Sequence, residues 1–175
     1  KITGKMPWVN AAGKNILGII EGTHKDLRNE AVILSAYYDA ISPVPSLAPG
    51  AEQACGSVAL LELARTFVDC PPDRTVILLF TSGHFQNLSG IRRFMPLLRA
   101  SRSEGEHSWS EADRTIIDRL SQHRIRLFIG LDLSSNSRIV GVQKPTSPYR
   151  IPLLAPPVTS HILELAGAYE DSVLG

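Results

Sequence analysis

The chain has 175 residues, of which 43% are hydrophobic and 20% are charged, and its formal net charge is +1. This length and composition are typical of a soluble globular domain with a real core. The near-neutral charge gives no reason to expect nucleic acid or an anionic membrane as a partner, and no apolar run is long enough to span a bilayer.

The first half of the chain predicts two strands, a loop and a helix. Apolar, β-branched runs cover residues 15–21 and 31–36, and the short polar connection between them predicts an antiparallel hairpin. Three prolines within residues 41–49 predict a surface loop. Apolar residues at helical spacing predict a helix over residues 56–68, and the two prolines at 71–72 end it.

The second half continues this alternation. Strands are predicted over residues 75–81, 124–133 and 137–142, and helices over residues 88–100, from Ser110 onwards, and over residues 158–169. The helix from Ser110 onwards begins with a capping box in which Ser110 is followed by Asp113 in place of the usual Glu. Alternating strands and helices of these lengths predict a three-layer α/β/α sandwich with a mixed, mostly parallel central sheet.

The two cysteines flank the helix predicted over residues 56–68. A regular helix would place Cys55 and Cys70 roughly 20 Å apart, which is too far for a disulfide. We therefore expect two free thiols, and the cysteines leave the cellular compartment open.

Three segments at the ends of predicted elements resemble a known family. Tyr37-Tyr38-Asp39 follows a strand, Pro-Gly-Ala-Glu-Gln-Ala-Cys-Gly-Ser opens a helix at residues 49–57, and His84-Phe85 follows the next strand. They resemble the zinc aminopeptidase family that includes aminopeptidase Y, bacterial leucyl aminopeptidases and glutamate carboxypeptidase. There the segments read Ala-His-x-Asp, Gly-Ala-Asp-Asp-Asn-Ala-Ser-Gly and Glu-Glu-x-Gly-Leu-x-Gly. The resemblance covers residues 15–142 and implies a zinc-exopeptidase-like fold.

The resemblance also implies where two zinc ions would lie, and it exposes replaced ligands. The first His ligand falls on Tyr37, whose phenol is a poor zinc ligand because a pKa of about 10 keeps such a group neutral. Asp39, which would orient that His, is kept. The bridging Asp falls on Glu52, a carboxylate that is longer by one methylene group, and a later Asp ligand matches Asp132.

The catalytic part of the resemblance is weaker still. The Glu that acts as general base falls on His84, and the neighbouring Glu ligand falls on Phe85, which cannot bind a metal. The last His ligand lies beyond Gly175 or does not exist, and His161, on a predicted helix, is a poor candidate for it. The alternatives without a functional role are that Tyr37 is a packing residue at a strand end and that His84 is a solvated loop residue.

These replacements favour a non-catalytic, pseudo-peptidase domain on an aminopeptidase scaffold that acts as a binding or assembly module. We expect no catalytic residue, no bound cofactor, and a protein or peptide partner that the sequence does not identify. The alternative is a residual metal-dependent hydrolase in which Glu52, His84 and Asp132 hold one zinc ion.

The domain organisation is predicted in the same terms. We expect residues 1–175 to form a single domain and to be a fragment of a longer protein, because the chain begins at Lys1 and not at Met. The interpretation as a binding or assembly module adds the expectation that the parent protein is membrane-anchored. Related enzymes pass more directly to the Asp strand, so residues 101–123 are predicted to be a surface insertion. The location is not specified by the residues, and the resemblance alone implies an extracytoplasmic one.

Overall fold

The computed structural model describes residues 10–42, 44–47, 50–103 and 108–133. Its elements are, in chain order, β1 (Ile16–Ile20), β2 (Glu30–Tyr37), the 3-10 turn η1 (Pro45–Leu47), α1 (Ala51–Asp69), β3 (Thr75–Thr81), α2 (Ser89–Ala100), α3 (Glu111–Ser121) and β4 (Arg124–Gly130). The chain divides into two units after Asp132, and all of these elements lie in the first. The strand predicted over residues 137–142 and the helix over 158–169 lie outside the described residues, so they and the single-domain organisation stay predictions.

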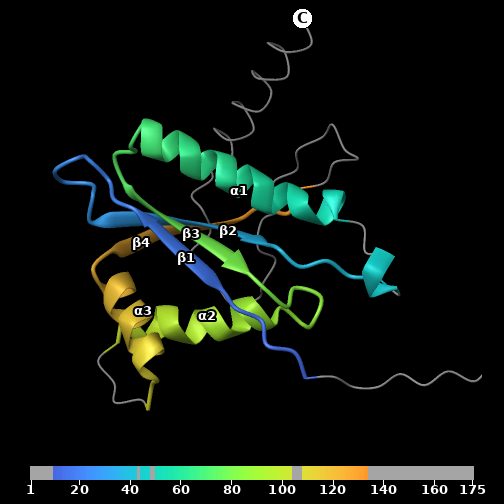
Figure 1. Ribbon diagram of the computed structural model, residues 1–175. Helices are drawn as coiled ribbons and strands as arrows, with labels where there is room; N and C mark the ends of the chain where they lie inside the picture. The colour runs from blue at the N-terminus through green and yellow to red at the C-terminus, as the bar shows by residue number, and fades with distance from the viewer. Residues whose placement is uncertain (1–9, 43, 48–49, 104–107, 134–175) are drawn as a thin grey trace, which may run out of the picture. The chain divides into compact units, whose positions relative to one another are not determined.

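The four described strands form one sheet in the order β1-β3-β2-β4 (Figure 1). β2 runs parallel to both β3 and β4, whereas β1 runs antiparallel to β3. The mixed, mostly parallel sheet is therefore confirmed. The central strands β2 and β3 are almost continuously apolar and are buried along nearly their whole length, as strands covered on both faces are.

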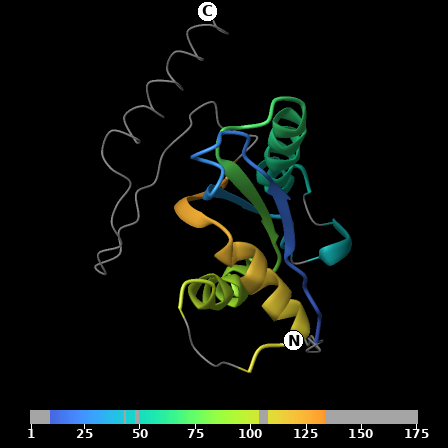
Figure 2. The ribbon, with the colours of Figure 1, turned by 90° about the vertical axis from the view of Figure 1, so that its left-hand side faces the viewer.

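Helices cover both faces of the sheet, with α1 on one side and α2 and α3 on the other (Figures 1 and 2). The buried group under α1 consists of Leu34, Ala36, Leu60, Val76 and Leu78. The buried group under α2 and α3 consists of Ala31, Ile33, Ile77, Leu79, Phe94, Leu98 and Leu120. Successive strand residues point to opposite faces, so β2 and β3 supply both cores, and the predicted α/β/α sandwich is confirmed.

The antiparallel hairpin predicted for the first two strands is wrong, because β3 lies between β1 and β2. The connection between β1 and β2 crosses the start of β3 and is held there by the buried Thr75. Its hydroxyl accepts a hydrogen bond from the backbone N–H of Gly22 at 3.0 Å and donates one to the carbonyl of Arg28 at 2.7 Å. One side chain of β3 thus binds both ends of the connection and keeps the two strands apart.

The capping box predicted at the start of α3 is confirmed, with one variation. The backbone N–H of Asp113 donates to Oγ of Ser110 at 3.2 Å, and the Ser110 hydroxyl donates to Oδ2 of Asp113 at 2.7 Å. Arg93 of α2 donates to the same Oδ2 at 2.6 Å, so this carboxylate joins the two helices. Leu120 at the other end of α3 is fully buried. α3 therefore belongs to the helical layer, and its status as an insertion relative to related enzymes stays a prediction.

Two details of the helices differ from the prediction. α1 begins at Ala51 and not at Gly56, because the helical path already starts at the Gly50 cap. On α2, helical spacing groups Met95 with Phe94 and Leu98, but Met95 is 36% exposed and Leu97 is buried instead.

Gly56 lies within α1 where that helix passes closest to the chain leaving β4. A Cβ at Gly56 would lie 2.5 Å from the carbonyl oxygen of Leu131 and 3.4 Å from Cβ of Ala36. The first distance is a clash with backbone, which cannot rotate away. A residue without a Cβ is therefore required for α1 to sit this close to the sheet.

We expect Gly56→Ala to lower the free energy of unfolding by about 1–3 kcal/mol, the usual cost of overpacking. This cost exceeds the gain in helix propensity from alanine, which is at most about 1 kcal/mol. Urea unfolding followed by circular dichroism measures the difference. Gly130→Ala is the control, because a Cβ there would meet only Oγ of Ser35, at an ordinary 3.8 Å. Equal losses in the two variants would contradict the close approach.

The pH dependence of stability provides a second test. The hydrogen bond from the Ser110 hydroxyl, together with Arg93, holds the pKa of the Asp113 carboxyl below its ordinary value of 3.8. A carboxyl whose pKa is lower in the folded state stabilises the fold above its unfolded pKa, and this contribution is lost as the pH falls through the folded pKa. We expect the wild type to be more stable than Asp113→Asn at neutral pH, and the difference to shrink between about pH 5 and pH 2. Urea unfolding at each pH tests this, and a constant difference would contradict it.

Candidate functional site

The predicted site residues lie where three strands end. Tyr37 is the last residue of β2 and Asp39 follows it, His84 and Phe85 come after β3, and Asp132 comes after β4. Because β2 is parallel to both neighbours, the carboxyl ends of the three strands meet at one edge of the sheet. In open α/β sheets this is the edge where ligands bind. The structure therefore brings these five predicted residues together.

Tyr37, His84 and Phe85 form a group of three rings, called here the aromatic cluster. The rings of Tyr37 and His84 are stacked, with centroids 3.9 Å apart and an angle of 24° between their planes. Phe85 meets both edge-on, with its centroid 5.7 Å from that of Tyr37 and 5.0 Å from that of His84. Stacked and edge-to-face arrangements are those in which aromatic side chains attract one another. All three residues are half-buried, so the cluster packs on itself and still reaches solvent.

Two carboxylates next to the aromatic cluster accept hydrogen bonds from its residues. Oδ1 of Asp132 accepts a hydrogen bond from the Tyr37 hydroxyl at 3.1 Å. Both oxygens of Asp39 accept from the backbone N–H of His84, at 3.2 and 3.0 Å. Each carboxylate thus has a donor within the protein, and Asp39 anchors the loop that carries His84 and Phe85.

The backbone around the aromatic cluster is fixed by residues that the sequence did not single out. Asn15 accepts from the backbone N–H of Ser82 at 3.3 Å and donates to the carbonyl of Gly90 at 2.8 Å, so it holds both ends of the loop after β3. Ser57 of α1 donates to the carbonyl of Tyr37 at 2.5 Å. Asn15 and Gly90 are 75 positions apart in the chain, and no local pattern signals such a bond. Ser57 lies within the segment that opens the helix, and this position was the one feature of the sequence that could have indicated its role in the site.

The loop itself has an unusual backbone. Gly83, Asn87 and Leu88 have φ angles of 66°, 57° and 54°, in the left-handed region that leucine rarely adopts. The carbonyl of Gly83 accepts from the N–H groups of Gln86 and Ser89, at 3.2 and 2.9 Å. This tight turn places His84 and Phe85 at its start, beside Tyr37.

The described residues do not fit a zinc site. Zinc requires three or four nitrogen, oxygen or sulfur ligands at about 2.0–2.3 Å. Within residues 10–42, 44–47, 50–103 and 108–133, no group of three or more His, Cys, Asp or Glu side chains is placed to hold a metal ion. His84 is stacked on Tyr37, and Phe85 offers no ligand atom. Glu52 lies in the first turn of α1, and its side chain is outside the description.

Two further predictions concern the surroundings of the site. Cys55 and Cys70 do not form a disulfide, as their spacing predicted. Across the part of the chain that the structure describes, no helix is both long and apolar enough to cross a bilayer.

Comparisons with known proteins identify the family to which the chain is similar. A model of the family described as Peptidase family M28 matches residues 15–140, a range that contains all the strand-end residues described above. A vacuolar membrane protease from Laccaria bicolor is 34% identical over 107 residues, which are 61% of this chain and 9% of that protein. The chain therefore spans less than a tenth of the length of this relative. No solved structure matches the chain.

The packing of the aromatic cluster can be tested at Phe85. We expect Phe85→Glu to lower the free energy of unfolding by about 1–3 kcal/mol, because a half-buried carboxylate would replace the ring that packs edge-on against Tyr37 and His84. Phe85→Leu keeps an apolar side chain and should cost only about 0.5–1.5 kcal/mol, the value of the lost aromatic contacts. Urea unfolding of both variants measures the two costs. A glutamate that is tolerated as well as leucine would show that Phe85 does not pack.

Proposed function

Because this chain belongs to peptidase family M28, we propose that it is a non-catalytic member of the family, a pseudo-peptidase domain that binds or assembles with a protein or peptide. The apolar strands and helices that build the scaffold are kept. The side chains at the strand ends are the ones that depart from peptidase chemistry, and they depart together.

The observation that carries this proposal is the aromatic cluster. Tyr37, His84 and Phe85 stand at positions where the resemblance implies a ligand, the general base and a second ligand. Their rings attract one another at 3.9 to 5.7 Å, so they replace metal coordination by packing. A general base must also reach the water that it activates. His84 is stacked face to face on Tyr37, which supports a structural role for its ring.

The state of the carboxylates supports the same proposal. Asp132 is the described carboxylate that the resemblance makes a metal ligand, and its Oδ1 already accepts a hydrogen bond from the Tyr37 hydroxyl. Asp39, which the resemblance gives no metal, uses both oxygens on the His84 N–H. An ion at Asp132 would have to compete with the Tyr37 hydroxyl for this carboxylate. Hydrogen bonds to charged groups contribute about 1.5–3 kcal/mol where they are shielded from water. We therefore propose that the domain holds no zinc ion in this site.

The rival function is a hydrolase with one zinc ion held by Glu52, His84 and Asp132. His84 would have to leave its stack on Tyr37. The ion would have to compete with the Tyr37 hydroxyl for the carboxylate of Asp132. Both requirements weaken this alternative, and measurement of the metal content separates the two functions.

We also propose that the domain belongs to a longer, membrane-anchored protein and lies on the extracytoplasmic side. The relative from Laccaria bicolor is named a vacuolar membrane protease, and this chain matches 9% of its length. A domain that faces a vacuolar lumen or the cell exterior would meet peptides and protein partners there, in keeping with a binding or assembly role.

We expect the purified domain to retain far less than one zinc ion per chain after dialysis, as measured by mass spectrometry. It should also release no product from aminoacyl reporter substrates between about pH 6 and 9, the range in which a metal-bound water and its base operate. An active M28 aminopeptidase, dialysed and assayed in the same way with added zinc, is the positive control. Tightly held zinc near one per chain, together with turnover that a chelator abolishes and zinc restores, would overturn the proposal. Glu52, His84 and Asp132 would then be the first residues to replace.

The same assay can be applied to variants in which single residues are changed back to those of the active enzymes. It distinguishes a catalytic site that is lost from one that is only weakened. Groups that act as a unit contribute non-additively. We therefore expect no activity in any of the four single reversions, which are Tyr37→His, Glu52→Asp, His84→Glu and Phe85→Glu. Activity gained by any single reversion would show that most of the catalytic site is still in place.

A further inference from the structure

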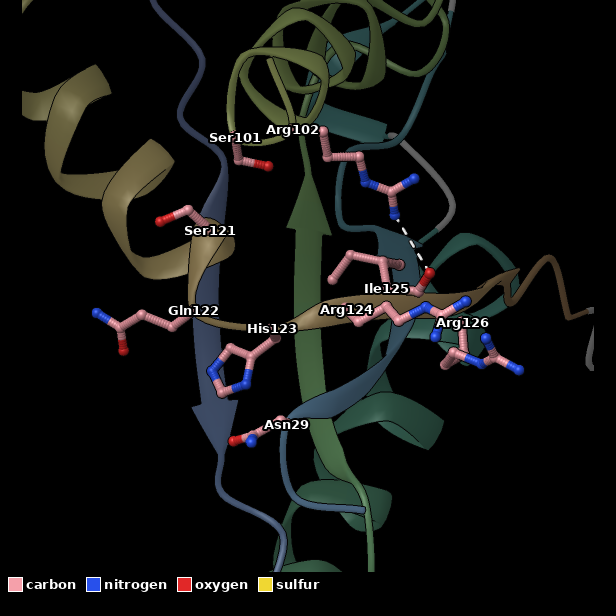
Figure 3. Close-up of a pocket in the computed structure, with 9 residues that line it drawn as sticks. All are labelled: Asn29, Ser101, Arg102, Ser121, Gln122, His123, Arg124, Ile125 and Arg126. Carbon is pink, nitrogen blue, oxygen red and sulfur yellow. Dashed lines mark hydrogen bonds between the residues drawn. The ribbon is translucent and has the colours of Figure 1, made fainter. Parts of the chain in front are cut away.

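An open hollow of about 730 Å³ lies beside the start of β4. Arg124 begins β4 and Asp132 follows its end, and a strand of this length spans about 20 Å, so the hollow is far from the aromatic cluster. Its lining comes from the loop before β2, the ends of α2 and α3 and the first residues of β4 (Figure 3). We call it the basic hollow, and the lining residues that matter below are Asn29, Arg102, Gln122, His123, Arg124 and Arg126.

Three arginines gather in the lining of the basic hollow. Figure 3 shows the guanidinium groups of Arg102, Arg124 and Arg126 on the same side of the start of β4. Nη2 of Arg102 donates to the carbonyl of Ile125 at 3.2 Å, which holds this side chain against the strand. Arg124 makes no ion pair or side-chain hydrogen bond with any residue that the structure describes. Like charges repel, so three neighbouring guanidinium groups with few partners favour an anionic ligand.

A bulge in β4 helps to gather them. Ala31 of β2 pairs with Ile125 and Val32 pairs with Leu127, so Arg126 is an extra residue in β4. An extra residue bends a strand and re-aims its side chains. β4 is also the last strand of the described sheet, and its arginines are exposed.

His123 provides an independent observation. Its side chain is only 6% exposed, and the nearest carboxylate oxygen, Oε1 of Glu21, is 3.8 Å from its Nε2. Its Nδ1 is buried and has no hydrogen-bond partner among the described residues. Buried polar atoms normally have a partner. The side-chain amides of Asn29 and Gln122, both exposed, make no hydrogen bond within the described part of the chain.

Negative charges near the basic hollow do not cancel the arginines. The ends of α2 and α3 point to it, and each contributes about half a negative charge. Glu30 is shared between Nε of Arg74 at 2.9 Å and Nε of Arg126 at 3.5 Å. The Arg74 hydrogen bond, with the charges of Arg126 and Arg124 behind it, holds the pKa of Glu30 below its ordinary value. Neither Arg102 nor Arg124 has a carboxylate partner among the described residues, so a positive excess remains.

We propose that the basic hollow binds a polyvalent oxyanion of the phosphate class. A guanidinium group binds phosphate through a rigid fork of N–H donors, and phosphate can accept several such forks, whereas a carboxylate is satisfied by one. This site is separate from the aromatic cluster, and it does not depend on whether the domain is catalytic.

The proposal is tested by titrating the purified domain with inorganic phosphate and pyrophosphate, using backbone amide NMR shifts as the readout. We expect saturable shifts around Arg102 and Arg124 with a dissociation constant of about 1 mM or lower at low salt. Added salt should weaken the binding, since it screens exposed charges. Arg124→Gln should raise the dissociation constant about tenfold without a change in circular dichroism. Arg65→Gln is the matched control, because Arg65 is an exposed arginine of α1 with 77% side-chain exposure, and it should leave the dissociation constant unchanged.

A second arm distinguishes free phosphate from phosphate on a lipid. Co-sedimentation is measured with phosphatidylcholine vesicles that contain or lack phosphatidic acid, a phosphomonoester lipid. Saturable binding of the free anions identifies the oxyanion itself as sufficient, and binding to phosphatidic acid vesicles alone identifies a headgroup as the source. No saturable binding to the anions or the vesicles overturns the proposal. Equal losses in Arg124→Gln and Arg65→Gln also overturn it, because the binding would then reflect only net charge.

Discussion

The parallel pairing of β2 with β3 places Tyr37 directly opposite Thr81, and most of the molecule depends on that register. The chain leaving β3 begins next to the Tyr37 side chain, so His84 and Phe85 are within reach of its ring. The same register directs alternate residues of both strands into two separate cores. A shift by one residue would exchange the two cores and turn Tyr37 to the other face of the sheet.

At the edge where the strands end, this register brings two carboxylates next to hydrogen-bond donors. Asp39 and Asp132 are carboxylates that need donors wherever water is partly excluded. A metal ion is one source of compensation, and protein donors are another. Here the Tyr37 hydroxyl and the His84 backbone N–H supply it. Tyr37, which stands where the resemblance implies a His ligand, thus supplies Asp132 with a hydrogen-bond donor from within the protein.

Sequence patterns predicted the elements better than their arrangement. The apolar run of β3 gave its bounds, and the residues after three parallel strands were expected at one edge. The strand order was not predictable, because the contacts that go with it, such as the bonds of the Thr75 hydroxyl to Gly22 and Arg28, join residues far apart in the chain. Two other contacts are also long-range and have no local signal in the sequence. They are the stacking of Tyr37 on His84 and the hydrogen bonds of Asn15 to the loop after β3. The bulge at Arg126 was not predicted either. It is a local irregularity, and the sequence around it has the pattern of an ordinary strand.

The stack of Tyr37 on His84 gives the domain a spectroscopic label of its own. Two rings with centroids 3.9 Å apart lie within each other's ring-current fields, so the imidazole protons of His84 resonate away from the frequencies of a free imidazole. A molecule that settles on this edge and tilts either ring changes those frequencies. The site can therefore be observed in the unmodified protein, at a single residue, without attaching a probe.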